Sequence, residues 1–308
     1  MTALQTSDIN ARVTADPKGF MEEQNAAYQQ HVKGVADHLI AQFSGRGLVF
    51  LCGPSASGKT TTAALLQRFL SENGRRAHTV SLDDFYLGRG LAPRLPDGSF
   101  DYETVDALDL PLLHRTMDVL LETGTASLPI FDFQSGIRHD NARSLTIEDD
   151  SFVILEGIHA LHPRLRESLA AHEGFTLCIG TFSSVYEGKE RLLSERDMRL
   201  VRRLLRDVRF RNSDLENTFD MWRQVVRGED LYLSPYVGDA DAAFDTTHAY
   251  EPALFSGELL PLLREVSAAS PYYHEAQRLA GVLSRFVPFS PSLLPPDSLL
   301  KEFAGAPL

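Results

Sequence analysis

The sequence predicts an α/β fold in three layers, with a mostly parallel sheet between helices. Short apolar runs at residues 48–52, 152–155 and 175–180 indicate strands, and residues 77–82 read as a further strand. Between the segments 48–52 and 77–82, apolar residues recur at helical spacing, as they do again over residues 108–121. The run at 152–155 is apolar without interruption, which is typical of a parallel strand covered on both faces. Strands that alternate with helices favour a layered α/β architecture.

Composition and charge exclude several classes of protein. The chain has 308 residues, of which 43% are hydrophobic, as in an ordinary globular protein with a sizeable core. Its formal net charge of −12 argues against a general nucleic-acid or membrane-surface binder. No apolar run approaches the length of a membrane span, and the N-terminus lacks the features of a signal peptide. Cys52 and Cys178 fall in apolar runs and are expected as buried thiols, which fits a reducing cytoplasm.

The remaining segments also carry structural signals. Residues 1–16 are expected as a loose tail, residues 20–43 as a helix, and residues 88–104 as a mobile surface loop. Residues 127–133 and 142–147 could pair as a hairpin around Gly136. The charged stretch 186–211 is expected to be helical, followed by helices at 215–226, 254–266 and 272–286, a short strand at 242–244 and a proline-rich tail.

A phosphate-binding motif lies between the first strand and its helix. Residues 53–61 read Gly-Pro-Ser-Ala-Ser-Gly-Lys-Thr-Thr and match the Walker A pattern G-x-x-x-x-G-K-[ST]. Backbone N–H groups and the helix dipole favour an anion at such a place. Lys59 would reach the outer phosphates of a nucleotide, and the Thr60 hydroxyl would bind Mg²⁺. The residues expected to bind nucleotide here are Gly53, Ser55, Ser57, Gly58, Lys59, Thr60 and Thr61.

Two carboxylates follow predicted strands. Asp83 lies at the carboxyl end of the strand at 77–82, where open α/β sheets bind ligands. It could accept the proton of an attacking hydroxyl or hold Mg²⁺ through water, although Asp83 or Asp84 could also simply cap a turn. Glu156 follows the buried run at 152–155, the Walker B position, and is expected to orient Mg²⁺ or a metal-bound water.

Arginines are concentrated in one stretch of this acidic chain, at Arg196, Arg199, Arg202, Arg203, Arg206, Arg209 and Arg211. Arg199, Arg202 and Arg206 are spaced i, i+3 and i+7 and share a helix face. Such a helix can close over a nucleotide as a lid and stabilise a phosphate in transfer. A solvated helix of alternating charge and an RNA-binding patch are the alternatives. The neighbouring phosphate loop favours the lid.

In this order, the segments resemble the uridine kinase and phosphoribulokinase family of P-loop kinases. Besides the phosphate loop, the resemblance rests on residues 81–86, 100–109, 129–138, 155–159 and 197–207, and it covers about residues 30–305. Residues 221–229 and 298–303 are similar to a bacterial nucleoside-kinase branch. Members of that branch often carry an N-terminal TGS module, which these residues do not include. The resemblance implies a P-loop kinase domain at 47–265 with a lid at about 186–212, preceded by a tail and a packed helix at 1–46. A helical extension and tail would follow at 266–308.

The resemblance also implies an activity. It is transfer of the γ-phosphate of ATP, with Mg²⁺, to the 5′-hydroxyl of a nucleoside such as uridine or cytidine. Asp83 matches the catalytic base, Thr60 and Glu156 match the Mg²⁺ positions, and Lys59 would act with them. The lid arginines would complete the phosphate contacts. Arg199 is expected among the catalytic residues, and Arg202 and Arg206 are expected to bind the nucleotide.

The acceptor residues follow from the same resemblance. Asp101 or Glu103 would hold the ribose hydroxyls, and two extra residues in this segment leave that choice open. The residues expected to border the acceptor, beside the hairpin, are Tyr86, Phe131, Phe133 and Arg138. The expected partners are ATP and a small acceptor, and a homo-oligomer is an open possibility.

One departure concerns the acceptor. Well-studied uridine kinases read the base with a Tyr and a His, and Phe131 and Gly136 stand at those places here. A pyrimidine would lose two polar partners, and such partners set specificity. Another nucleoside, a sugar or a cyclitol therefore stays open as the acceptor. A non-catalytic ATP sensor is a further alternative, and an RNA-dependent ATPase is disfavoured by the net charge.

Overall fold

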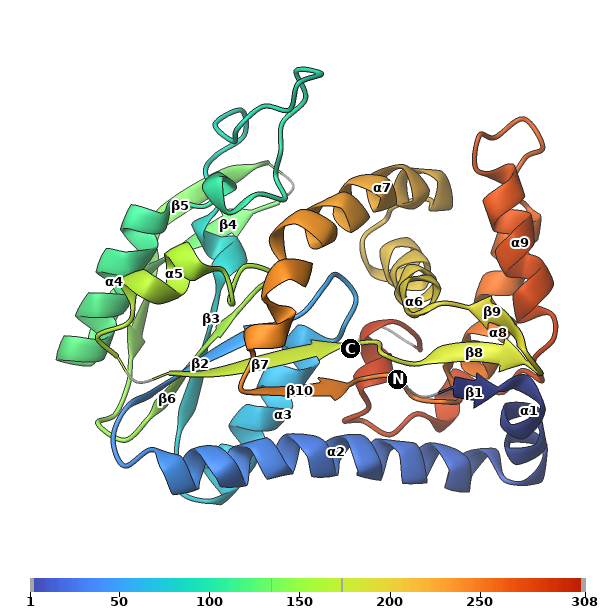
Figure 1. Ribbon diagram of the computed structural model, residues 1–308, viewed down its shortest axis with the longest axis horizontal. Helices are drawn as coiled ribbons and strands as arrows, with labels where there is room; N and C mark the ends of the chain where they lie inside the picture. Colours follow the sequence, from blue (N-terminus) through green and yellow to red (C-terminus); the bar gives the residue numbers. More distant parts are fainter. Residues whose placement is uncertain (1–2, 134, 173, 306–308) are drawn as a thin grey trace.

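The computed structural model describes residues 3–133, 135–172 and 174–305. A five-stranded sheet with the order β10-β7-β2-β6-β3 forms its centre, and every neighbouring pair is parallel (Figure 1). The strands are β2 (Gly47–Cys52), β3 (Ala77–Ser81), β6 (Phe152–Glu156), β7 (Gly174–Gly180) and β10 (Ala242–Asp245). The predicted parallel sheet is therefore confirmed.

The sheet lies between two hydrophobic cores. Along β2, Val49 and Leu51 belong to one core, whereas Leu48 and Phe50 belong to the other, because successive side chains of a strand point to opposite faces. The first core includes α2 (Pro17–Gln42) and α3 (Lys59–Glu72), and the second includes α4 (Leu110–Thr123) and α5 (Pro163–Ser168). The three predicted layers are visible in Figure 1.

The N-terminal segment departs from the prediction of a loose tail. Residues 3–15 form β1 (Ala3–Gln5) and α1 (Thr6–Ala15), and Ile9 and Val13 of α1 are buried. β1 pairs in parallel with β8 (Ser184–Glu187), which pairs with β9 (Glu190–Leu193). The prediction was wrong because the partner of β1 is distant in sequence, so local composition carries no sign of it. Residues 1–2 and 306–308 of the two predicted terminal segments lie outside the described residues.

The expected helical lid is only partly helical. Its first residues belong to β8 and β9, and α6 (Glu195–Phe210) begins after Ser194, whose hydroxyl oxygen accepts the N–H of Asp197. α6 packs against α7 (Leu215–Tyr232) and α8 (Glu251–Arg264), and residues 198–207 are all buried. It is therefore a core helix whose sides are covered.

The other predicted elements are present. The hairpin consists of β4 (Thr125–Asp132) and β5 (Ile137–Thr146), and α9 (Tyr273–Leu283) follows α8. After α9, the helical structure in the described residues up to 305 consists of short 3₁₀ turns at Pro291–Leu293 and Leu299–Glu302. No helix in the described ranges is both long and apolar enough to cross a bilayer.

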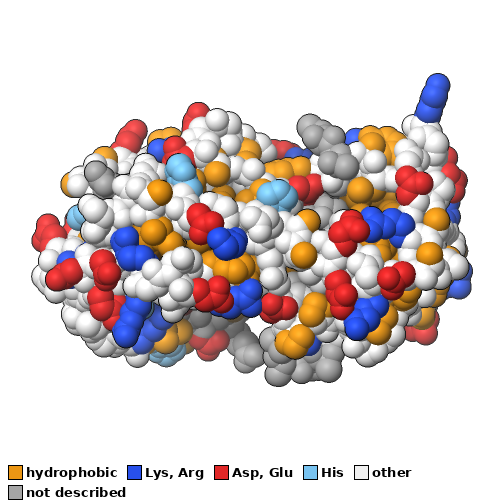
Figure 2. All heavy atoms as spheres, turned by 90° about the horizontal axis from the view of Figure 1, so that it is seen from below, with side chains coloured by type: hydrophobic (Ala, Val, Ile, Leu, Met, Phe, Trp, Pro, Cys, Tyr) orange, Lys and Arg blue, Asp and Glu red, His pale blue; other side chains and the backbone are white. Residues whose placement is uncertain are grey.

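The face that α2 helps to form carries acidic and basic side chains side by side (Figure 2). Lys33 and Asp37 of α2, for example, form an ion pair at 2.6 Å. Interspersed charges of both signs give this face no extended basic surface.

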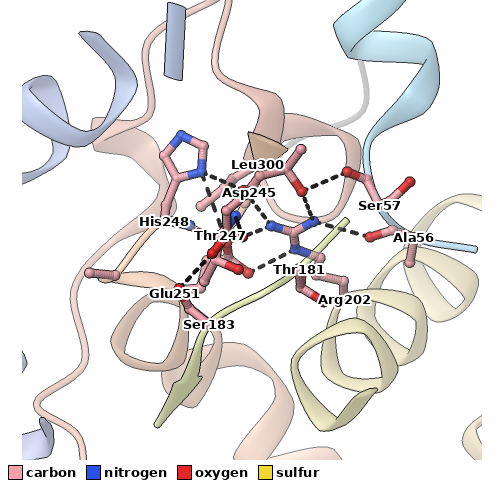
Figure 3. Close-up of polar contacts among 12 residues, drawn as sticks. Ala56, Ser57, Thr181, Ser183, Arg202, Asp245, Thr247, His248, Glu251 and Leu300 are labelled. Atoms are coloured by element: carbon pink, nitrogen blue, oxygen red, sulfur yellow. Dashed lines mark hydrogen bonds and ion pairs between the residues drawn. The ribbon is translucent and has the colours of Figure 1, made fainter. Parts of the chain in front are cut away.

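A buried arginine joins four parts of the fold (Figure 3). The guanidinium of Arg202 in α6 donates to both carboxylate oxygens of Glu251, at 2.6 and 2.8 Å. It also donates to the carbonyl oxygens of Thr246, at 2.7 Å, and of Ala56 in the phosphate loop, at 3.1 Å. Neither charged side chain has any exposed surface. The bidentate geometry offsets the desolvation that burial of two charges would otherwise cost.

Replacement of Arg202 by methionine should lower the free energy of unfolding by about 3–5 kcal/mol, because it leaves the Glu251 carboxylate buried without its partner. Urea denaturation followed by circular dichroism measures this loss. Arg196→Met is the matched control, since it removes an exposed ion pair with Asp230 from the same helix and should cost at most about 1 kcal/mol. Equal losses in the two variants would contradict the role given to Arg202.

Candidate active site

The phosphate loop joins β2 to α3 in a conformation that needs two of its glycines. Gly58 has φ +89°, in the left-handed region that favours glycine. A Cβ atom at Gly53 would lie 2.5 Å from the carbonyl oxygen of Ile179 in β7, so a larger residue would collide with that strand. α3 begins at Lys59, so its free first-turn N–H groups lie at the loop. The loop can therefore hold an anion.

A cavity of about 210 Å³ lies over this loop. Of the residues predicted to bind nucleotide, five line this cavity, namely Ser55, Ser57, Gly58, Lys59 and Thr60. Three arginines, Arg203, Arg206 and Arg211, line it as well. With Lys59 they form a cationic lining that suits a polyanion such as a triphosphate.

Thr60 and Glu156 form a polar pair in this cavity. The Thr60 hydroxyl donates to one Glu156 oxygen at 3.5 Å, and the other oxygen is buried without a hydrogen-bond partner in the described structure. Burial raises the pKa of the Glu156 carboxyl, and Lys59 opposes the shift. Mg²⁺ takes hard oxygen ligands from one or two protein groups and completes its shell with water and phosphate. The pair fits such an ion, while no three His, Cys, Asp or Glu residues of the described ranges gather as a metal cluster.

Asp83 lies in the 3₁₀ turn after β3, where its N–H is held by the Ser81 hydroxyl at 3.3 Å. Its side chain is exposed to solvent within the cavity that it lines, and protein atoms lie around it on the other sides. Burial raises the pKa of its carboxyl, Lys59 opposes the shift, and Asp84 adds to it. Asp84 is engaged elsewhere, because it accepts the N–H of Phe131 at 3.3 Å and thus holds the β4–β5 hairpin.

A second cavity, of about 430 Å³, adjoins the first. It is lined by Asp83, Tyr86, Arg89, Tyr102, Glu103, Phe131, Phe133, Gly136 and Met221. The rings of Tyr86, Phe131 and Phe133 lie from 5.0 to 6.3 Å apart and form an aromatic wall. Asp83, Tyr86 and Glu103 line both cavities, so this is where a donor and an acceptor could meet.

Asp101 and Glu103, between which the sequence leaves the choice of a ribose carboxylate open, lie in different surroundings. Asp101 accepts the Tyr232 hydroxyl at 3.0 Å and the N–H of Glu103 at 3.1 Å, and it lines neither cavity. Glu103 faces both cavities. Burial raises the pKa of its carboxyl to about 7, with Arg203 opposing the shift and Asp101 adding to it.

The three arginines of α6 that were predicted to contact phosphates do not all line the first cavity. Arg206 lines the first cavity, but Arg199 and Arg202 do not. Arg199 donates to Glu229 at 2.7 Å and to the carbonyl of Ser55 at 3.2 Å, so it supports the loop from outside the cavity. Helical spacing could not reveal this, because residues 198–207 of α6 are all buried and its arginines have partners in different parts of the fold.

Arg203 and Arg211 line the cavity although the sequence did not assign them to the site. Arg203 donates to the Ser55 hydroxyl at 2.9 Å. The sequence signal for Arg203 and Arg211 was their position in the arginine-rich stretch 196–211. Arg89 of the second cavity had no such signal, because it belongs to the aperiodic loop. Tyr102 was one of several aromatics clustered near the motifs, and Met221 lies in the segment 221–229, whose resemblance pointed to a family branch and not to a site role.

Three predicted residues lie beside the cavities. Arg138 pairs with Asp109 at 3.1 Å and thereby supports the hairpin. Gly53 lies under β7. The Thr61 hydroxyl donates to Glu302, from the C-terminal segment, at 2.8 Å.

Comparison with known proteins identifies the family. The model of the phosphoribulokinase / uridine kinase family matches residues 48–251. The uridine kinase of Saccharomyces cerevisiae is 26% identical over 215 residues, which are 68% of this chain and 39% of that relative. The uridine kinase of Deinococcus deserti is 27% identical over 209 residues, covering 67% of this chain and 91% of the relative.

A solved structure agrees in fold. The structure of a possible uridine kinase from Bacillus stearothermophilus superposes with a TM-score of 0.50 at 19% identity, over 71% of this chain and 100% of that one. At this identity the likeness concerns the fold alone. From the family model and these relatives, the chain belongs to the phosphoribulokinase and uridine kinase family, which is a family of P-loop kinases.

Proposed function

We propose that the protein transfers the γ-phosphate of ATP to the 5′-hydroxyl of a nucleoside, with uridine or cytidine as the preferred acceptor. The observation that carries the proposal is the position of Asp83, which lines both the cationic cavity over the phosphate loop and the aromatic cavity beside it. A carboxylate between a phosphate donor and a hydroxyl acceptor suits a kinase base. The relatives named uridine kinase support a nucleoside acceptor. A cytoplasmic location is part of the same proposal.

In this mechanism Asp83 accepts the proton of the acceptor hydroxyl while the oxygen of that hydroxyl forms a bond to the γ-phosphorus. The bond from that phosphorus to the β–γ bridging oxygen breaks, and ADP leaves. Lys59, Arg203 and Arg206 stabilise the charge on the transferring group. Mg²⁺ at Thr60 and Glu156 would neutralise charge on the phosphate oxygens. Catalysis then rests mainly on positioning and charge stabilisation.

The second cavity suits a nucleoside in two respects. The wall formed by Tyr86, Phe131 and Phe133 offers ring faces on which a base can stack. Glu103 can accept hydrogen bonds from ribose hydroxyls. Phe131 and Gly136 supply no polar side chain to read the base, and this favours a second candidate, a kinase for another small alcohol.

An acceptor screen that follows ADP release tests the substrate proposal. Uridine and cytidine should accelerate ADP release well above the ATP-only rate, because they supply both a flat base and ribose hydroxyls. A mass spectrum of the product should show the 5′-monophosphate. Inert uridine and cytidine together with turnover of a non-nucleoside alcohol would contradict the nucleoside proposal and support the second candidate.

Asp83→Asn should lower kcat by about 10²–10⁴, because the amide cannot accept the proton. Binding of ATP, measured by calorimetry, should change little. Asp84→Asn is the matched control, since Asp84 holds the hairpin and should cost at most about tenfold in kcat. Turnover of Asp83→Asn at the wild-type rate would rule out the base.

Acceptor binding should depend on pH through Glu103. Its carboxyl has a pKa of about 7, so below that pH it is protonated and accepts hydrogen bonds from the acceptor less well. The acceptor KM should therefore rise, by up to about tenfold for each pH unit below 7. Glu103→Gln should give a high KM that does not change over this range.

Asp101→Asn provides the matched test of this assignment. The Asp101 charge contributes to the raised pKa of Glu103, so its removal should move the KM profile to lower pH. A profile that is the same in wild type and in Glu103→Gln would assign the pH dependence to another group.

A further inference from the structure

The C-terminal segment, residues 298–304, lies on the phosphate loop. We propose that this segment occupies part of the nucleotide site and is displaced when a nucleotide binds. The inference rests on the proposed function in one respect, because it takes ATP as the ligand of the phosphate loop. In this proposal, residues 298–304 compete with ATP for the space over the phosphate loop.

The first contact is a carboxylate at an anion site. The Thr61 hydroxyl, in the first turn of α3, donates to Glu302 at 2.8 Å. The N-terminus of a helix that follows a Walker A loop is the place where nucleotide phosphates bind. Glu302 also lines the cavity over the loop, among the cations Lys59, Arg206 and Arg211. Its negative charge therefore stands where a nucleotide would bring its own.

The second contact is apolar and covers the loop backbone. A Cβ atom built on Gly58 would lie 2.5 Å from a methyl carbon of Leu299, so this side chain rests directly on the loop. The Arg202 guanidinium lies 5.1 Å from the centre of the Phe303 ring, and Arg202 in turn holds the carbonyl of Ala56. Leu299, Leu300 and Phe303 have no exposed surface. The segment is thus seated on the loop by both polar and apolar contacts.

The space around the loop supports displacement. The cavity of about 210 Å³ over the loop is smaller than the 300–1,000 Å³ typical of small-molecule sites, so it has room for phosphates but not for a whole ATP. A hollow of about 450 Å³ lies beyond it, between α3 and the C-terminal residues. Thr60 and Glu302 line both spaces. A nucleotide that spanned them would pass the hydrogen bond between Thr61 and Glu302, which is the bond that the proposal expects to break.

Glu302→Gln tests the competition. The amide keeps the size of the side chain and can still accept the Thr61 hydroxyl, but it no longer repels phosphates. Isothermal titration calorimetry with ATP and Mg²⁺, without any acceptor, should show binding about tenfold tighter than in wild type, as expected for removal of one nearby like charge. Asp37→Asn removes the same charge from the exposed face of α2 and should leave the affinity within about twofold. Unchanged or weaker binding in Glu302→Gln would overturn the proposal.

Hydrogen exchange in the unmodified protein provides a second test. Saturating ADP with Mg²⁺ should speed the exchange of backbone amides in residues 298–304, because the segment leaves the loop. Slower exchange would show that the segment closes over the nucleotide as a wall of the site, and unchanged exchange would show that the two do not meet. Either result overturns the proposal.

The two proposals fail in different ways. Because both measurements omit the acceptor, displacement of the segment by nucleotide would stand even if no nucleoside were phosphorylated. Absence of any nucleotide binding in both wild type and Glu302→Gln would overturn both.

Discussion

The contact on which the site depends is the attachment of the phosphate loop to the buried arginines of α6. Arg199 and Arg202 donate to the carbonyl oxygens of Ser55 and Ala56, and Arg203 donates to the Ser55 hydroxyl. Ala56 has φ +61°, a left-handed conformation that is costly for a residue other than glycine. With its carbonyls turned to the arginines, the loop is held in one shape before any ligand arrives. Glu229 and Glu251 neutralise two of these arginines, and their charges are therefore compensated inside the protein.

The order of the strands brings the chemistry to one edge of the sheet. β2, β6 and β3 are neighbours, and they end in the phosphate loop, in Glu156 and just before Asp83, respectively. The carboxyl ends of parallel strands share an edge, so three groups distant in sequence lie around one cavity. The hairpin of β4 and β5, attached through Asp84, adds the aromatic wall on the acceptor side.

What could be predicted from the sequence was mostly local. The strands of the central sheet are short apolar runs, and the phosphate loop is a contiguous motif, so both were recognisable without tertiary information. The strand β1 was missed because its pairing with β8 is a long-range contact. The different surroundings of Asp101 and Glu103 could not be predicted, since only the fold shows that Tyr232 donates to Asp101 while Glu103 faces the two cavities. Arginine spacing did not show which arginines face the cavity, because residues 198–207 of α6 are all buried and no single face of this stretch is free. The contact between Glu302 and the loop depends on the fold of the C-terminal segment, so no local pattern predicts it.

The central claim is that Asp83 stands between a donor on the phosphate loop and an acceptor in the aromatic cavity. A crystal structure with ADP, Mg²⁺ and a bound acceptor tests it most directly. The account predicts the phosphates on residues 53–61 and the reacting hydroxyl about 2.6–3.2 Å from an Asp83 oxygen, with the rest of the acceptor against Phe131 and Phe133. An acceptor bound outside this cavity, or a hydroxyl that faces no carboxylate, would contradict it.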